Sequence, residues 1–355
     1  MEVFLRSALT GPLLALAAAL LAACQVEAPM GSTRPPAETA ATPGSGGVPT
    51  SAPTGAAQPA SPTPVPKPVR QVWVAVEKAG QVVLVDLDRQ EVIARHRTGG
   101  GPHNLTVAPG GTVAAALYGS DALAIIRDGR SLTVRLGGRP HDVKAAGDRF
   151  VVTNEEARRI DLVSLEGRQV GSIPLRAQPH DLDVTPDGST AWVTLNGTDE
   201  LALIDLAAGQ VIRYHATGQQ PHDIRVGADG RLWVTDWRGP LHVLSGEGQL
   251  QASLSLGREA HHLAFTPDGA QLWLVDHAIR QAYIVDTATV QPTGQIELPG
   301  APHHVAVTGD GSLAAIADHT NGTVVVYDVA SRRLVATIEV GPEPHGLWAP
   351  ASAPQ

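Results

Sequence analysis

The sequence predicts an all-β fold, a seven-bladed β-propeller whose blades are four-stranded antiparallel sheets. A short phrase, usually Pro-His followed by a polar residue, occurs seven times along the chain. Successive copies lie 38, 39, 42, 39, 42 and 42 residues apart. Each interval holds four short alternating segments separated by turns, which is the size and content of one propeller blade. The repeated histidines are His103, His141, His180, His222, His261, His303 and His345.

One repeat unit illustrates the expected strands, which we name A to D from the channel outwards. After His180, residues 181–185, 191–195, 201–206 and 211–216 alternate apolar and polar side chains. Pro, Asp, Gly and Asn separate these segments, as expected of tight turns between antiparallel strands. The repeated histidine is therefore expected at the end of a D-to-A loop, just before the innermost strand.

The two ends of the repeat region predict how the ring closes. The region begins with a strand B at residues 71–76 and ends with a strand A at residues 345–348. The last strand A should join the first blade, which removes an exposed sheet edge. We therefore assign the propeller to residues 70–350, followed by a short tail at 351–355.

The first 69 residues have a different composition. Residues 1–23 resemble a lipoprotein signal peptide, with Arg6 before an apolar run and Leu-Ala-Ala before the sole cysteine, Cys24. Residues 24–69 are rich in Pro, Ala and Thr, which favours a disordered tether over a packed domain. The resemblance implies lipidation of Cys24, export, and a membrane anchor on the periplasmic or outer-surface side.

Composition excludes several classes of function. The net charge of −9 argues against a nucleic-acid-binding surface. One cysteine excludes an internal disulfide, a CxxC redox pair and a cysteine zinc cluster. We find no nucleotide-binding loop, dinucleotide fingerprint or hydrolase elbow. We expect a monomer that binds a protein or a small molecule.

Two segments carry a resemblance to a known family. Val151-Val152-Thr153-Asn154 and Trp233-Val234-Thr235-Asp236 are similar to the phrase that names the bacterial YVTN-type repeat, found in YncE-like propellers. The resemblance covers residues 70–350 and implies the seven-bladed fold. It says little about activity, because binding proteins, surface proteins and enzymes share this scaffold.

The repeated histidines have two interpretations. All seven should surround the mouth of the central channel on the face that carries the D-to-A and B-to-C loops. They could form a ring for a divalent transition metal, since neutral imidazole is a ligand for zinc, copper and nickel. Nitrous oxide reductase resembles the chain in blade number, but its cysteine ligands and second copper domain are absent. Alternatively, each histidine could bond a polar residue of the B-to-C loop, as in WD-type propellers. These loop residues are Asn154, Asn196, Asp236, Asp276 and Asp318.

Two neighbouring repeats depart from the pattern in the same way, and we take them as the candidate site. Each has a second histidine directly after the repeated one and an Asp-His pair further along. A ligand seldom has seven-fold symmetry, so departures are better indicators than the repeat itself. The repeat before these two adds an aromatic residue and a cation to the same face, in the segment Asp236-Trp237-Arg238. The candidate ligand or metal residues are His261, His262, Asp276, His277, His303, His304, Asp318 and His319.

We expect a lipid-anchored, extracytoplasmic binding platform with a His- and Asp-rich metal or small-ligand site at the channel mouth. The alternative is a metal-assisted enzyme, lyase-like or oxidoreductase-like, that uses the same face. Its nearest resemblance is to the streptogramin B lyases, with no catalytic residue carried over.

Overall fold

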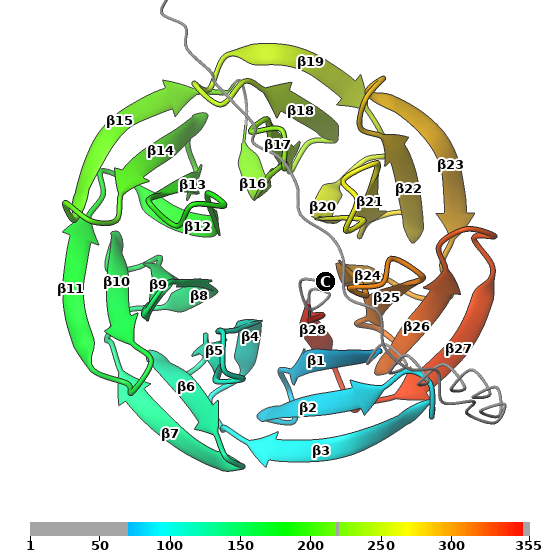
Figure 1. The fold of residues 1–355 in the computed structure, drawn as a ribbon, viewed down its shortest axis with the longest axis horizontal. Helices are drawn as coiled ribbons and strands as arrows, with labels where there is room; N and C mark the ends of the chain where they lie inside the picture. The colour runs from blue at the N-terminus through cyan, green and yellow to red at the C-terminus, as the bar shows by residue number, and fades with distance from the viewer. Residues whose placement is uncertain (1–69, 218–219, 351–355) are drawn as a thin grey trace, which may run out of the picture. The chain divides into compact units, whose positions relative to one another are not determined.

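Seven four-stranded sheets form a closed ring in the computed structural model, which describes residues 70–217 and 220–350 (Figure 1). The predicted fold class is confirmed. The predicted signal peptide, Cys24, the tether and the tail at 351–355 lie outside the described residues. Within the described part, no helix has the length and apolarity needed to cross a membrane.

The first four blades run from the N-terminus of the ring. Blade 1 contains β28 (Pro344–Trp348), β1 (Gln71–Val76), β2 (Gln81–Asp86) and β3 (Glu91–Arg97). Blade 2 contains β4 (Pro102–Val107), β5 (Val113–Leu117), β6 (Ala122–Arg127) and β7 (Arg130–Arg135). Blade 3 contains β8 (Pro140–Ala146), β9 (Arg149–Asn154), β10 (Arg159–Ser164) and β11 (Gln169–Pro174). Blade 4 contains β12 (Gln178–Val184), β13 (Thr190–Asn196), β14 (Glu200–Asp205) and β15 (Gln210–Ala216).

Three further blades complete the ring. Blade 5 contains β16 (Pro221–Val226), β17 (Leu232–Asp236), β18 (Pro240–Leu244) and β19 (Leu250–Ser255). Blade 6 contains β20 (Ala260–Phe265), β21 (Gln271–Asp276), β22 (Gln281–Asp286) and β23 (Gln291–Glu297). Blade 7 contains β24 (Pro302–Val307), β25 (Leu313–Asp318), β26 (Thr323–Asp328) and β27 (Leu334–Glu339).

The ring closes as the sequence predicts. Strand β28, from the end of the chain, pairs antiparallel with β1 and supplies the inner strand of blade 1. An ion pair joins blade 1 to blade 7, because Nε of Arg70 lies 2.8 Å from Oδ2 of Asp310 in the turn before β25. The inner edge of blade 1 is therefore paired rather than open.

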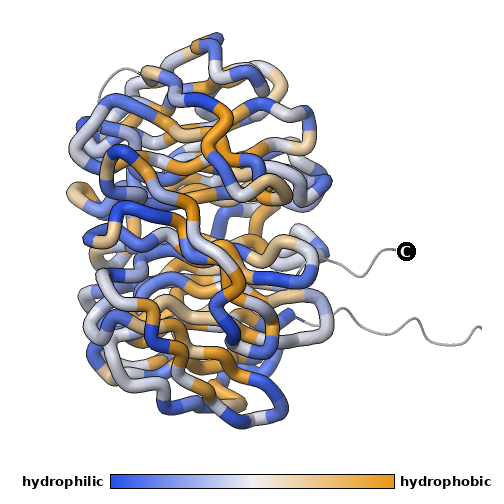
Figure 2. The backbone as a smooth tube through the Cα atoms, turned by 90° about the vertical axis from the view of Figure 1, so that its left-hand side faces the viewer, coloured by the Kyte–Doolittle hydropathy of each residue, from blue (hydrophilic) through white to orange (hydrophobic). Residues whose placement is uncertain are grey.

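Apolar side chains fill the wedges between neighbouring blades. Trp192, Trp233 and Trp273, which share one position on the second strand of their blades, are at most 2% exposed. Each belongs to a core cluster that joins two adjacent blades. Figure 2 shows the apolar segments within the strands and hydrophilic segments in the loops of both faces. Rigid inter-blade packing fixes the positions of the inner strands, and these strands line the channel.

Candidate functional site

Every inner strand begins with a β-bulge. In blade 4, Pro179 faces Leu195 and Leu182 faces Val193, so three steps on β12 oppose two on β13. The same shift occurs in the other six blades. A bulge lets two successive residues project to one side of a sheet. The repeated histidine therefore lies inside the inner strand, and not before it as the alternation of the sequence suggested.

A threonine on the second strand holds each of three bulges. In blade 4, Oγ1 of Thr194 accepts a hydrogen bond from the backbone N–H of Asp181 at 2.9 Å. The same hydroxyl donates to the backbone carbonyl of His222 in the next blade at 2.7 Å. Thr153 and Thr235, the third letters of the repeated phrase, make the same two bonds. This threonine thus sets the position of one histidine relative to the next.

The bulges and the pleat give the channel three successive layers of side chains. The first layer, the His ring, consists of His103, His141, His180, His222, His261, His303 and His345. The second layer consists of Asn104, Asp142, Asp181, Asp223, His262, His304 and Gly346. The third layer consists of Thr106, Lys144, Asp183, Arg225, Ala264, Ala306 and Trp348.

The seven imidazoles of the His ring form an unbroken circle. Neighbouring ring centroids are 3.3 to 4.6 Å apart all the way round. Three of the histidines point Nδ1 at the backbone carbonyl of the next histidine in the ring: His141 at 3.2 Å, His222 at 3.3 Å and His261 at 3.0 Å. In a neutral histidine with this contact, a proton on Nδ1 leaves the lone pair on Nε2.

The loop-bonding interpretation of the His ring does not match these contacts, because the polar loop residues bond elsewhere. Both carboxylate oxygens of Asp276 accept backbone N–H groups, from residues 258 and 259 and from 278 and 279. Asp236 accepts the N–H groups of Gln220 and Arg238. Asp318 accepts both N–H groups of Asn321, backbone and side chain. Asp236, Asp276 and Asp318 are buried and shape the loops, so they are poorly placed as metal ligands.

Burial keeps most of these imidazoles neutral. It lowers the pKa values of His103, His222, His303 and His345 far below the ordinary value, and neighbouring imidazoles add to the effect. Burial also lowers the pKa of His261 to about 3. Neutral imidazoles are the form that binds a metal.

One histidine behaves in the opposite way. Burial opposes protonation of His141, but its Nδ1 lies 3.3 Å from Oδ1 of Asp181, and this carboxylate raises the pKa of His141 to about 9. Burial alone would raise the pKa of Asp181, but His180, His141 and His262 hold it well below its ordinary value. We therefore assign a buried ion pair to His141 and Asp181.

The His ring lies at the base of an open cavity of about 360 Å³ on the face of the D-to-A and B-to-C loops. Trp237 lines this cavity, with its ring centroid 4.0 Å from that of His222 in an edge-on arrangement. Arg238 does not line it. Tyr118 and Glu155 also line the cavity, and their side-chain oxygens lie 3.4 Å apart. Our sequence analysis did not single out Tyr118, although it occupies in blade 2 the position that Trp237 occupies in blade 5.

The structure brings the histidines of the two exceptional repeats together. His277 lies close to the His ring, 5.4 Å from His261 between centroids, and its Nδ1 contacts the carbonyl of Pro302 at 2.9 Å. His319 is half-buried and lies 5.7 Å from His303 and 6.2 Å from His277 between centroids, and it also lines a second cavity with Lys78 and Glu343. His304 points to the opposite half of the channel. The six histidines of the predicted sector therefore lie close together, although His304, 4.4 Å from His262 between centroids, lines the opposite cavity.

Three imidazoles form a compact set of potential metal ligands. One ring nitrogen from each of His222, His261 and His262 lies within 4.8 Å of the other two, and all three residues line the mouth. Neither ring nitrogen of His262 has a hydrogen-bond partner among the described residues. Other three-residue sets involve carboxylates: Glu77 with His103 and His345, His141 with His180 and Asp181, and Asp181 with Asp223 and His262.

The fold and this channel define the class of protein, a seven-bladed β-propeller with a histidine-lined mouth. Residues 65–229 match the family described as "YNCE-like beta-propeller", which identifies this part of the ring as YNCE-like. No curated protein matches the chain.

Solved structures with similar folds have varied activities. One is hydrazine synthase of Kuenenia stuttgartiensis, 16% identical, covering 70% of this chain and 89% of that one, with a TM-score of 0.64. A second is virginiamycin B lyase of Staphylococcus aureus with quinupristin, 18% identical, covering 69% of this chain and 87% of that one, with a TM-score of 0.62. A third is a dihydro-heme d1 dehydrogenase in complex with DHE, 17% identical over 82% and 77%, TM-score 0.60. At such identities the likeness shows the fold alone.

Proposed function

We propose that this propeller is an extracytoplasmic binding protein that takes up one divalent transition metal ion at the channel mouth, through His222, His261 and His262. The observation that carries the proposal is the set of three buried imidazoles whose nitrogens lie within 4.8 Å of one another beside an open cavity. Imidazole-only sites suit zinc, copper and nickel rather than magnesium or calcium.

Hydrogen bonding prepares two of the three ligands. Nδ1 of His222 and of His261 contacts a backbone carbonyl, which favours the tautomer with a free lone pair on Nε2. The same contacts orient both rings. A small shift of the side chains would bring the nitrogens to zinc-binding distance, roughly 2.0–2.1 Å from the ion.

The third ligand has a carboxylate beside it. Nδ1 of His262 lies 3.2 Å from Oδ2 of Asp223, although the angle is outside the range of a hydrogen bond. A ligating histidine commonly has a carboxylate at its second nitrogen, and this partner orients the ring and raises its basicity. Binding of a metal at Nε2 would align this contact.

We further propose that lipidation of Cys24 anchors the protein to a membrane after export, with residues 24–69 as a tether. This proposed location rests on the position of the sole cysteine directly after an apolar N-terminal run. Metabolic labelling with a palmitate analogue tests it: the label should be present in the wild type and absent from Cys24→Ser.

A metal-assisted enzyme is the second candidate, and one observation favours it. The three imidazoles face an open cavity, so a metal held by them would keep a coordination position for water or a substrate, as catalytic zinc sites do. Glu155 lines the same cavity and could serve as a base.

The metal-binding proposal is tested on the mature protein purified without a metal-affinity tag. After chelator treatment, Zn²⁺, Cu²⁺ and Mg²⁺ are titrated by calorimetry. We expect one tight site for zinc or copper and none for magnesium. Weak binding of all three ions with equal affinity would contradict the proposal.

Variants locate the site. His262→Gln, and the double change of His222→Gln with His261→Gln, should each lower the affinity at least tenfold, since one or two ligands are lost. His96→Gln is the matched control, because His96 lies on β3 at the outside of blade 1. Retained tight binding in the double variant, with a melting curve like that of the wild type, would place the metal elsewhere.

A further inference from the structure

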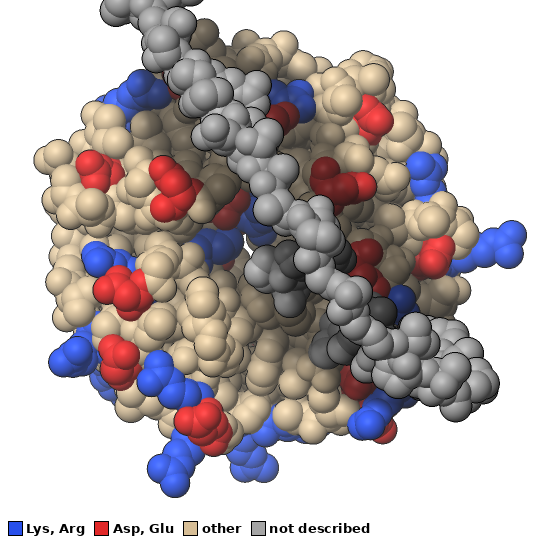
Figure 3. Space-filling model, in the orientation of Figure 1, with Lys and Arg blue, Asp and Glu red and all other residues tan. Residues whose placement is uncertain are grey.

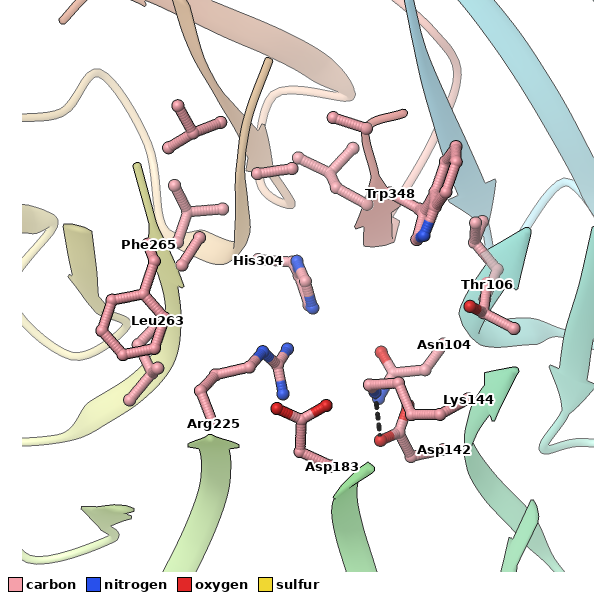
Figure 4. A pocket seen from close by; sticks show the side chains of 17 residues that line it. Asn104, Thr106, Asp142, Lys144, Asp183, Arg225, Leu263, Phe265, His304 and Trp348 are labelled. Atoms are coloured by element: carbon pink, nitrogen blue, oxygen red, sulfur yellow. Dashed lines mark hydrogen bonds and ion pairs between the residues drawn. The ribbon is translucent and has the colours of Figure 1, made fainter. Parts of the chain in front are cut away.

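The opposite end of the channel contains a second cavity, of about 290 Å³. It is lined by the third layer of channel side chains and by parts of the second (Figure 4). Asp142, Lys144, Asp183 and Arg225 bring charges to it, and Asn104 and His304 bring polar atoms. Asp142 and Lys144 form an ion pair with each other, 2.5 Å between Oδ2 and Nζ. Figure 3 shows Lys and Arg side chains around the central opening of the ring. None of these residues belongs to the metal-ligand set of the mouth.

The cavity has a cation, Arg225, and an anion, Asp183, that form no ion pair with each other in the described part of the chain. Arg225 donates through Nη1 to Oδ1 of Asp223 at 2.6 Å and to the carbonyl of Ile224 at 2.8 Å. Its Nε and Nη2 groups make no hydrogen bond within the described part of the chain. Oδ2 of Asp183 accepts the backbone N–H of Val226 at 2.8 Å. Figure 4 shows the guanidinium and this carboxylate both pointing into the cavity.

Two buried polar atoms of the same cavity also lack partners. Oδ1 of Asn104 and Nδ1 of His304 have no hydrogen bond, although Asn104 is only 3% exposed and His304 only 7%. Buried polar groups are nearly always paired, since an unpaired one loses its bonds to water without compensation. A ligand with donors and acceptors of its own would supply the missing partners.

The remaining wall is apolar. Leu263 and Phe265 lie on one side of the cavity, and Trp348 lies on another (Figure 4). Leu347 also lines it. The volume is close to the lower end of small-molecule sites, which span roughly 300–1,000 Å³. The cavity therefore suits a small molecule with one apolar and one charged part.

We propose that this cavity binds a small zwitterion with an apolar side chain, of the α-amino acid class. The carboxylate pairs with Arg225, the ammonium group pairs with Asp183 and Oδ1 of Asn104, and the side chain packs on Phe265 and Trp348. A simple anion would leave Asp183 uncompensated, and a simple cation would face the guanidinium of Arg225. Burial raises the pKa of Asp183, although Arg225 and Lys144 oppose this rise.

The test uses calorimetry on the full, chelator-treated protein with three probes that share the same isobutyl group. L-leucine has both charged groups, 4-methylpentanoate lacks the ammonium group, and 3-methylbutylamine lacks the carboxylate. We expect leucine to bind at least tenfold more tightly than either analogue, because each analogue leaves one buried charge unpaired. Absence of leucine binding at millimolar concentration overturns the proposal, and so does equal binding of either analogue. Chelator treatment excludes leucine bound through a metal at the mouth.

Two substitutions then assign the charges. Asp183→Asn keeps the shape of the side chain and should weaken leucine at least tenfold, as should Arg225→Gln. Arg238→Gln is the control, since Arg238 lies in a loop of the opposite face and lines neither cavity. If Arg225→Gln does not fold, as judged by its melting curve, Asp183→Asn decides alone. Unchanged leucine affinity in a folded Asp183→Asn protein overturns the assignment.

Discussion

Nδ1 of His262 lies 3.2 Å from Oδ2 of Asp223, across the boundary between blades 6 and 5. Both residues belong to the second layer of the channel, and both are at most 1% exposed. Burial raises the pKa of Asp223 to about 7, although Arg225 opposes this rise. The contact connects the proposed metal ligand to the charged half of the channel.

Asp223→Asn should weaken metal binding without removing a ligand. A carboxylate beside a ligating imidazole is worth about tenfold to a hundredfold in metal affinity. We expect a loss in this range for zinc, measured by competition with a chromophoric chelator. Asp148→Asn, at an exposed turn between β8 and β9, is the control and should bind as the wild type does. An Asp223→Asn protein with wild-type affinity would show that the carboxylate has no part in the site.

Trp237 should report copper at the mouth. Its ring lies 4.0 Å from His222 and 5.4 Å from His261, whereas Trp192, Trp233 and Trp273 are buried between blades. A bound Cu²⁺ ion quenches the fluorescence of an indole at this range much more than that of distant ones. One equivalent of Cu²⁺ should therefore lower the emission of the wild type, and Trp237→Phe should lose most of this change. Equal quenching in both proteins would place the copper away from the mouth.

The repeat made the fold predictable, but not the side-chain contacts within the channel. A fixed interval and a missing first strand A suffice to predict seven blades closed by the C-terminal strand. The bulge at His180 and Asp181 has no signature in the alternation of polar and apolar residues, so the strand was expected to begin at residue 181, three residues later than it does. The bulge became recognisable only when Thr194 was seen to bond the N–H of Asp181.

The candidate site was predictable only in part, for a related reason. Spacing in the sequence correctly groups His261 with its neighbours around the ring, because symmetry-related positions meet at the axis. It cannot separate Asp276, which accepts four backbone N–H groups, from a free ligand. Nor does spacing indicate a role for Arg225 and Asp183. The residue type at the third-layer position differs from blade to blade, and no motif marks this position.

The His141–Asp181 ion pair should make stability depend on pH. The pKa of His141 is raised to about 9 in the folded protein, from an ordinary value of 6.5. Its contribution is therefore complete below about pH 6.5 and is lost as the pH rises through 9. At 1.36 kcal/mol per pKa unit the upper limit is about 3 kcal/mol.

Urea unfolding of chelator-treated protein at pH 6.5 and 9.5 measures this loss. His141→Gln removes the titrating group, so its free energy of unfolding should fall less over the same interval. The channel carboxyl groups with raised pKa values, Asp183 and Asp223, are present in both proteins and cancel in the comparison. An identical pH dependence in the two proteins would argue against a charged His141.

Gly346 occupies the second-layer position that is polar or charged in the other six blades, and the closing blade has no room for a side chain there. A Cβ on Gly346 would lie 2.6 Å from the carbonyl oxygen of His103 and 2.9 Å from Cα of Asn104. Both are atoms of the backbone of β4, so relief requires β28 or β4 to move. We expect Gly346→Ala to lower the free energy of unfolding by about 1–3 kcal/mol, the usual cost of overpacking. Gly171→Ala is the control, because its nearest contact is an ordinary 3.4 Å to the Leu162 side chain. If chemical denaturation gave both variants the stability of the wild type, the close approach of β28 to β4 at the closure would be wrong.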